Sequence, residues 1–175
     1  MTVSDWKMLT LVGEDRPGIV ARVTAALYRA GWNLGEASMI RLGGNFTIMM
    51  MVSGQGSGKA LEQLLQPVSQ SLGLQVHVDA IGGGLHRHLV PNLQVRVVGA
   101  DRAGIVAKVT GALAEAGFNI LDLESDVAGT EQKPVYIMLI QGYAAATVEA
   151  LQQAVDAIGE SDMEVQVSAV ETLIG

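Results

Sequence analysis

The sequence predicts an α+β protein built from two copies of one βαββαβ unit. The first reason is an internal repeat, since GEDRPGIVARVTAAL at residues 13–27 returns as GADRAGIVAKVTGAL at residues 99–113, an offset of 86 residues. The second reason is that strand-like and helix-like apolar patterns follow the same order in both halves. A long repeat of this kind indicates two equivalent structural units.

Each copy begins with a strand and a tight loop. The apolar or β-branched runs at residues 7–12 and 93–98 end at Gly13 and Gly99. Short runs that are bounded by glycine are typical of buried strands.

A helix then follows in each copy. From Ile19 and from Ile105 the apolar positions recur with the spacing of a helix that buries one face. We expect Gly31 and Gly117 to end these helices in the left-handed conformation. Pro17 suits the first helical turn, where its missing N–H removes no hydrogen bond.

The rest of the first copy predicts two strands, a helix and a last strand. These are strands at residues 33–42, 46–52 and 74–80 and a helix over residues 61–72. Gly43-Gly44-Asn45 has the composition of a tight hairpin turn between the first two strands. Pro67 lies inside the helix and is expected to kink or break it.

The second copy repeats this order. Strands are predicted at residues 120–127, 135–141 and 163–169, with a loop over 128–134 and a helical stripe over 148–158. Both copies therefore predict a ferredoxin-like unit, a four-stranded antiparallel sheet with two helices on one face. We place the units at residues 1–82 and 93–175, joined by a linker at 83–92. The other face of each sheet needs a covering partner.

Composition limits the classes of function. The formal charge is −7 and the eleven basic residues are scattered, which argues against direct binding to nucleic acid. The chain has no cysteine, so it forms no disulfide and fits a reducing compartment. It shows neither a secretion signal nor an apolar run of about 20 residues, the length that a membrane span needs. We expect a cytoplasmic protein that does not enter membranes.

Motifs for catalysis, nucleotides or metals are incomplete. The segment SGQGSGKA, residues 53–60, lacks the first Gly and the last Ser or Thr of a phosphate loop. The pair His86 and His88 has no Cys, Asp or Glu nearby to complete a metal shell. No Ser-His-acid set can be assembled from this order of residues. The sequence therefore predicts a non-enzymatic protein without cofactor or metal.

The repeated segments carry a resemblance to a known family. DRPGIV and DRAGIV, followed by GWN and GFN, resemble ACT domains, the small regulatory modules of amino-acid metabolism. The likeness covers both copies, and a bare tandem pair is similar to the glycine cleavage system transcriptional repressor group. The DRPGIV form is also like the amino-terminal module of formyltetrahydrofolate hydrolase. The resemblance implies that a small amino acid of the glycine or serine class binds where the first loop of one unit meets the edge strand of its neighbour.

The candidate ligand-binding residues lie at the first loop and at the start of the second strand of each copy. They are Asp15, Arg16, Gly18, Ile19 and Asn33, and in the second copy Asp101, Arg102, Gly104, Ile105 and Asn119. The free N–H groups of a first helical turn attract a carboxylate, and a glycine there lets a ligand approach closely. The Asp carboxylate can hold an amino group, the Arg adds a charge-assisted bond, and the Asn offers a donor and an acceptor.

Each of these residue types also has a purely structural interpretation. In that interpretation the aspartates are helix caps, the arginines are solvated surface residues, and the asparagines are turn residues that start a strand. In addition, Ala103 stands in the second copy where the first has Pro17, so the two sites need not bind equally.

Together these features predict a sensor that acts as a homodimer and regulates transcription of glycine-cleavage-type metabolism. It would act through a transcription factor or a metabolic enzyme, without touching DNA. One alternative is a structural interaction module, or an allosteric subunit of an amino-acid-pathway enzyme, with no ligand of its own. A remote alternative is an acylphosphatase-like hydrolase, which shares the fold and uses an Arg with an Asn, although Asp15 beside Arg16 would repel a phosphate.

Overall fold

The computed structural model describes residues 6–81, 89–100, 103–159 and 161–170. The chain divides into two compact units, Met1–Arg87 and His88–Gly175. Unit 1 contains β1 (Trp6–Glu14), α1 (Ile19–Arg29), β2 (Asn33–Leu42), β3 (Asn45–Ser53), α2 (Gly58–Leu72) and β4 (Gln75–Ala80). Unit 2 contains β5 (Leu93–Ala100), α3 (Ile105–Glu115), β6 (Asn119–Thr130), β7 (Lys133–Tyr143), α4 (Val148–Asp156) and β8 (Met163–Ala169).

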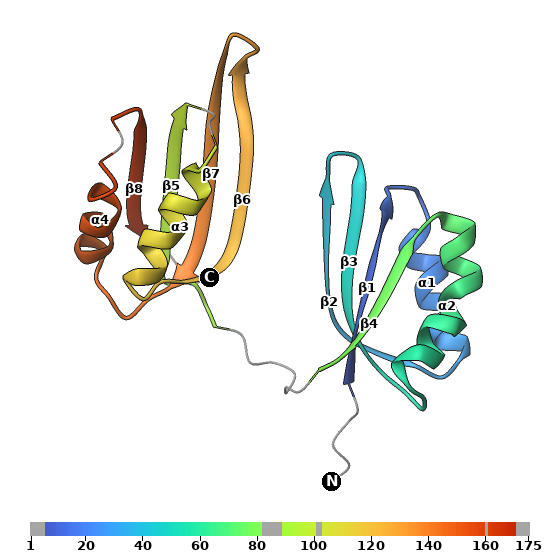
Figure 1. Ribbon diagram of the computed structural model, residues 1–175. Helices are drawn as coiled ribbons and strands as arrows, with labels where there is room; N and C mark the ends of the chain where they lie inside the picture. Colours follow the sequence, from blue (N-terminus) through green and yellow to red (C-terminus); the bar gives the residue numbers. More distant parts are fainter. Residues whose placement is uncertain (1–5, 82–88, 101–102, 160, 171–175) are drawn as a thin grey trace, which may run out of the picture. The chain divides into compact units, whose positions relative to one another are not determined.

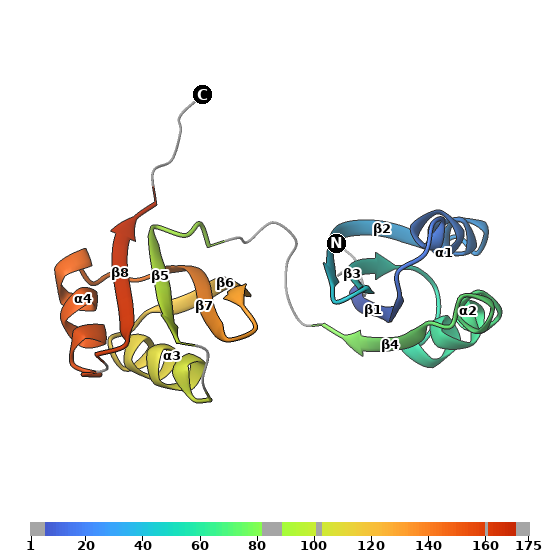
Figure 2. The ribbon, with the colours of Figure 1, turned by 90° about the horizontal axis from the view of Figure 1, so that it is seen from above.

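Both units have the predicted ferredoxin-like βαββαβ fold. The sheet orders are β2-β3-β1-β4 and β6-β7-β5-β8, and the paired strands are antiparallel. Within each unit the two helices lie on the same face of the sheet (Figures 1 and 2). None of the described helices is long and apolar enough to cross a membrane.

Each unit has its own aliphatic core between the sheet and the helices. In unit 1 it includes Leu9, Leu11, Met50 and Val52 from the sheet and Val23, Leu27, Leu61 and Leu65 from the helices. In unit 2 it includes Val95, Val97, Met138 and Ile140 with Val109, Leu113, Leu151 and Val155. The residues that alternate with these along the strands lie on the opposite face of the sheet, which the two helices of the unit do not cover.

That opposite face differs between the units. In unit 1 its strands β1, β2 and β3 carry exposed apolar side chains such as Val12, Ile40 and Met49, and β4 adds the polar Gln75, His77 and Asp79. In unit 2 the apolar side chains of β7 lie beside carboxylates of the edge strand, because Leu139 pairs with Glu124 and Ile137 pairs with Asp126.

An aromatic ring packs on a glycine in both units. A Cβ atom at Gly54 would lie 2.6 Å from Cδ2 of Trp32, and one at Gly142 would lie 2.5 Å from Cζ of Phe118. The Nζ atom of the buried Lys7 lies 5.5 Å from the centroid of the Trp32 ring, a cation–π contact. These glycines are therefore required by close packing rather than by a turn.

The outer edge of β8 is occupied by a side chain from α4. Gln152 donates from Nε2 to the carbonyl of Val165 at 2.9 Å, and its Oε1 accepts from the N–H of Val167 at 2.8 Å. Its carboxamide thus satisfies two backbone groups of the edge strand.

The predicted helix break at Pro67 and the predicted place of Pro17 are wrong. Helix α2 runs without a break from Gly58 to Leu72 although it contains Pro67. Pro67 is exposed, so water can solvate the backbone carbonyl that loses its hydrogen bond. Helix α1 begins at Ile19 with Gly18 as its N-cap, so Pro17 precedes the helix instead of lying in its first turn.

The turns confirm one prediction and correct another. Gly43 and Gly44 have φ values of 56° and 75° and form the tight β2–β3 turn. The predicted loop at 128–134 is wrong, because β6 continues to Thr130 and pairs there with Lys133. The turn-forming residue Gly129 sits within the strand at φ 92°, which glycine adopts without steric cost.

The predicted ends of α1 and α3 are confirmed, and the predicted extent of α4 is wrong. Gly31 and Gly117 have φ values of 75° and 78° just after α1 and α3, as predicted. Helix α4 ends at Asp156 and does not extend over the full apolar stripe to Ile158.

Candidate functional site

A cavity of about 300 Å³ lies at the amino-terminal end of α1. Its lining comprises Asp15, Arg16, Gly18, Ile19, Val20, Ala21, Met39 and Phe46. Four of the five residues predicted for the first copy are thus brought together by the loop between β1 and α1. The last two lining residues come from β2 and β3.

Gly18 sets the backbone geometry of this cavity. It is the N-cap of α1 in the left-handed conformation, with φ 86°, and its carbonyl accepts the first helical hydrogen bond from Arg22 at 3.0 Å. An added Cβ would meet nothing within 4 Å, so glycine is required by the φ angle and not by crowding. The N–H groups of the first turn have no intrahelical partner and form the positive end of the helix dipole.

Charged side chains surround the helix end. An oxygen of Asp15 lies 2.5 Å from Nη2 of Arg41, and an oxygen of Glu14 lies 2.5 Å from Nη2 of Arg16. The side chains of Arg16 and Arg41 are 52% and 67% exposed, whereas that of Asp15 is 26% exposed. Helix α1 has no side-chain cap, so the alternative role of Asp15 as a helix cap is contradicted.

The loop is tied to the β2–β3 hairpin. The N–H of Asp15 donates to the carbonyl of Gly44 at 3.0 Å, which brings the hairpin beside the helix start. Sequence reasoning missed Met39, Arg41 and Phe46 as neighbours of Asp15. The hairpin signal at Gly43-Gly44 placed them near one sheet end, but only the strand register assigns that end to the first loop.

Asn33 lies at the other end of the same sheet. It pairs with Ser53, as Trp6 does, whereas Glu14 at the loop pairs with Asn45. Eight residues of β3 separate those positions, which corresponds to about 26 Å. Within unit 1 the structure therefore does not bring Asn33 to the other predicted residues. Asn119 is placed in the same way, opposite Tyr143.

The second copy repeats the helix start. Gly104 is the N-cap of α3 with φ 95°, Ile105 is its first residue, and Gly104 accepts from the N–H of Lys108 at 3.0 Å. Asp101 and Arg102 lie outside the described residues. The nearby cavity of about 510 Å³ is lined by the ends of β5, β7 and β8 rather than by Gly104 or Ile105.

The incomplete phosphate-loop motif has structural roles in the described part of the chain. Ser57 caps α2 through its Oγ, which accepts from the N–H of Ala60 at 3.2 Å, and Gly54 packs on Trp32. No group of three or more His, Cys, Asp or Glu that could hold a metal occurs in the described part of the chain. His86 and His88 lie outside that part.

The architecture and the first-unit cavity define a tandem pair of ferredoxin-like modules with a ligand-sized cavity at a helix start. The family model of the ACT domain matches residues 8–79 and again residues 92–168. The chain therefore belongs to the ACT-domain family and contains two tandem copies of the domain.

Two curated relatives differ in how much of the chain they cover. The glycine cleavage system transcriptional repressor of Escherichia coli (strain K12) is 26% identical over 144 residues, which is 81% of this chain and 76% of that protein. The UPF0237 protein YjhC of Lactococcus lactis subsp. lactis (strain IL1403) is 39% identical over 83 residues, which is 46% of this chain and 95% of that protein. The first relative thus aligns with both units and the second with the length of one.

Solved structures show the same fold. A putative glycine cleavage system transcriptional repressor has a TM-score of 0.73 at 21% identity and covers 98% of this chain and 100% of its own. An unknown protein from Galdieria sulphuraria has a TM-score of 0.74 at 24% identity, with coverage of 96% and 99%.

Proposed function

We propose that this protein is a regulatory sensor that binds a small amino acid of the glycine or serine class in the α1 cavity. The observation that carries the proposal is the cavity itself, which places the Asp15 carboxylate and the positive end of α1 around one space of about 300 Å³. A volume at the lower end of the usual range for ligand sites favours a small ligand.

The charges of the cavity suit a zwitterion. The ligand carboxylate binds the first-turn N–H groups of α1, which are a ready anion site. The ligand ammonium binds Asp15 in place of Arg41, whose largely exposed side chain can return to water at small cost because exposed ion pairs contribute about 0–1 kcal/mol. The displaced guanidinium then lies free to approach the ligand carboxylate.

Met39 links the cavity to a surface. It lines the cavity from the helix-facing side of the edge strand β2, where it pairs with the buried Ile48, whereas its neighbours Ile40 and Leu42 are exposed on the opposite face. A ligand that contacts Met39 therefore changes the opposite surface of β2, which a second copy or a partner protein would cover, only by moving the strand itself. Occupancy regulates only if the ligand prefers one of two arrangements of that surface.

One relative and the net charge support a proposal for the target of regulation. One relative is named a transcriptional repressor of the glycine cleavage system, and the net charge of −7 argues against DNA contact by this chain. We infer that the protein controls such a pathway through a transcription factor or an enzyme, without catalysing a reaction. The hydrolase alternative is disfavoured because Arg16 and Asn33 lie at opposite ends of the sheet.

Calorimetric titration and thermal unfolding with free amino acids test the proposal. A ligand that binds only the folded state adds about 2.7 kcal/mol at a hundredfold excess over its Kd, a shift of several degrees. We expect glycine or L-serine to bind, and glycinamide and N-acetylglycine, which each lack one charge, to bind much more weakly.

Two variants separate binding from folding. Asp15→Asn should abolish the ligand response of the folded protein, whereas Asp79→Asn, at an exposed carboxylate of β4 beside His77, should keep it. An unresponsive wild-type protein that nevertheless binds its partner would overturn the sensor and favour the structural interaction module.

A further inference from the structure

Unit 2 departs from unit 1 at the end of its second helix. Ser57 and Thr147 cap α2 and α4 in the same way, since each side-chain oxygen accepts from the N–H three residues on. The following strands also start equivalently, because Gly13 packs against Leu74 as Gly99 packs against Met163. Between these two matched points α2 has 15 residues and α4 has 9, a difference of about 1.7 turns.

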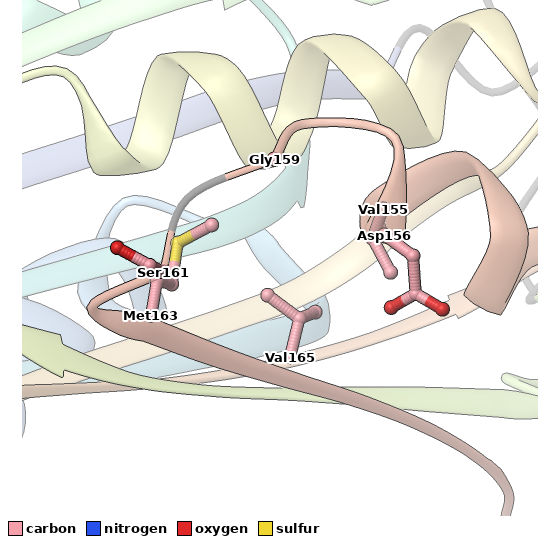
Figure 3. Close-up of a pocket in the computed structure, with 6 residues that line it drawn as sticks. All are labelled: Val155, Asp156, Gly159, Ser161, Met163 and Val165. Atoms are coloured by element: carbon pink, nitrogen blue, oxygen red, sulfur yellow. The ribbon is translucent and has the colours of Figure 1, made fainter.

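In unit 2 a turn follows the shorter helix, with the N–H groups of Ile158 and Gly159 donating to the carbonyls of Val155 and Asp156, both at 3.1 Å. In unit 1 the last turns of α2 bury Ser69 and Leu72, which are 8% and 6% exposed. In unit 2 a cavity of about 210 Å³ lies between the end of α4 and β8. Its lining residues are Val155, Asp156, Gly159, Ser161, Met163 and Val165 (Figure 3).

The cavity combines an apolar wall with one negative end. Figure 3 shows the Asp156 carboxylate on one side, Ser161 and Met163 on the other, and Val165 between them. Asp156 lies in the last turn of α4, where the helix dipole is also negative and where no basic residue is present. Gln152 donates one hydrogen bond to Oδ1 of Asp156 at 2.8 Å, which leaves most of the acceptor capacity of the carboxylate.

We propose that this cavity binds a small organic cation, a protonated aliphatic primary amine. Its ammonium group contacts Asp156 at the carboxyl end of α4, and its chain lies on Val155, Met163 and Val165. A free amino acid does not fit this charge pattern, because its carboxylate would face a carboxylate and the negative end of a helix. A divalent metal ion is disfavoured because the described residues form no group of three ligands.

The site therefore differs in chemistry from the α1 cavity of unit 1, which offers both signs of charge. It follows that a tandem protein of two similar units would respond to two different classes of small molecule.

NMR titration of the full chain with n-butylammonium tests this inference. We expect shifts of the methyl signals of Val155, Met163 and Val165, and no such shifts with n-butanol, the uncharged isostere, or with glycine. Equal binding of n-butanol would overturn the proposal, as would shifts confined to other residues.

Variants sharpen the test. Asp156→Asn keeps an acceptor for Gln152 but removes the charge, so it should weaken amine binding about tenfold or more. Glu164→Gln is the matched control, because this neighbouring carboxylate pairs with Val98 away from the cavity lining and its loss should leave binding unchanged.

Two further variants test whether the amine needs the volume of this cavity and whether the cavity acts independently of the α1 cavity. Val165→Leu fills the cavity and should abolish amine binding while the protein stays folded. Asp15→Asn, which tests the amino-acid site, should leave amine binding unchanged. Undiminished binding to Asp156→Asn or to Val165→Leu would refute the assignment, whatever the result for amino acids.

Discussion

Alanine at position 54 places a methyl group in the volume that the Trp32 ring occupies. The new Cβ would lie 2.6 Å from Cδ2, 2.8 Å from Cε3 and 3.0 Å from Cγ of the indole. The ring cannot swing into solvent freely, because Trp32 is 6% exposed. Overpacking of this kind costs about 1–3 kcal/mol. At about 4–8 °C per kcal/mol for a small domain, a loss of about 2 kcal/mol lowers the unfolding midpoint of unit 1 by about 8–16 °C.

Tryptophan fluorescence measures this loss selectively. The chain has two tryptophans, Trp6 and Trp32, and both belong to unit 1. Urea unfolding of Gly54→Ala, followed by emission, should therefore show a lower midpoint than wild type with an unchanged slope. In a Trp32→Leu background the same change should cost much less, because the ring is gone.

The control for Gly54→Ala is a glycine of the other unit. Gly111 lies inside α3, and a Cβ there meets nothing within 4 Å. Gly111→Ala should stabilise unit 2 by about 1 kcal/mol through helix propensity, as measured by far-UV circular dichroism. If Gly54→Ala unfolds at the wild-type urea concentration, the packing of Trp32 on the Gly54 backbone is refuted.

Three further perturbations test other features. Gly18→Ala should lower the unfolding free energy of unit 1 by about 1–2 kcal/mol because its φ is 86°, and a neutral result in urea unfolding would contradict the left-handed N-cap. Gln152→Ala should destabilise unit 2 by about 1–3 kcal/mol and speed hydrogen exchange of the Val167 N–H, because two backbone groups of β8 lose their partner. The pKa of Glu149 lies below its ordinary value of 4.5 because the carboxylate accepts hydrogen bonds from its own backbone N–H and from Thr147. Glu149 therefore stabilises the folded state above pH 4.5 and loses this effect as the pH falls further. The stability difference between wild type and Glu149→Gln, measured by urea unfolding, should accordingly shrink in acid, and a difference independent of pH would exclude this role.

The fold could be predicted from the sequence because the repeat and the apolar periods agree at every element. The bounds of β2 and β8 are those predicted, since Gly43-Gly44 and the strict alternation from Met163 are strong local signals. The loop over 128–134 was mistaken because Gly129 and Pro134, typical turn residues, face each other within a ladder. Local composition cannot distinguish a turn from a strand end that tolerates the same residues.

The site was predictable only where it is local in sequence. Asp15, Arg16, Gly18 and Ile19 form one loop, so the motif found them together, whereas Met39 and Arg41 come from another strand and depend on register. Asn33 was grouped with them although helix α1 runs back along the sheet before β2 begins, so Asn33 starts that strand at the far end. The cavity of unit 2 could not be predicted from the sequence, because the apolar stripe continues to Ile158, beyond Asp156, where α4 ends.

The hydrogen bonds of Gln152 also bear on solubility. An unpaired strand edge is a template on which further chains can add, and such growth leads to aggregation. At β8 the carboxamide already occupies the Val165 carbonyl and the Val167 N–H, so an incoming strand must first displace it. At the opposite edge of the same sheet, Asp122, Glu124 and Asp126 lie along β6 and would repel a second copy of that strand. In unit 2, therefore, a side chain hinders strand addition at one edge of the sheet, and negative charge hinders it at the other edge.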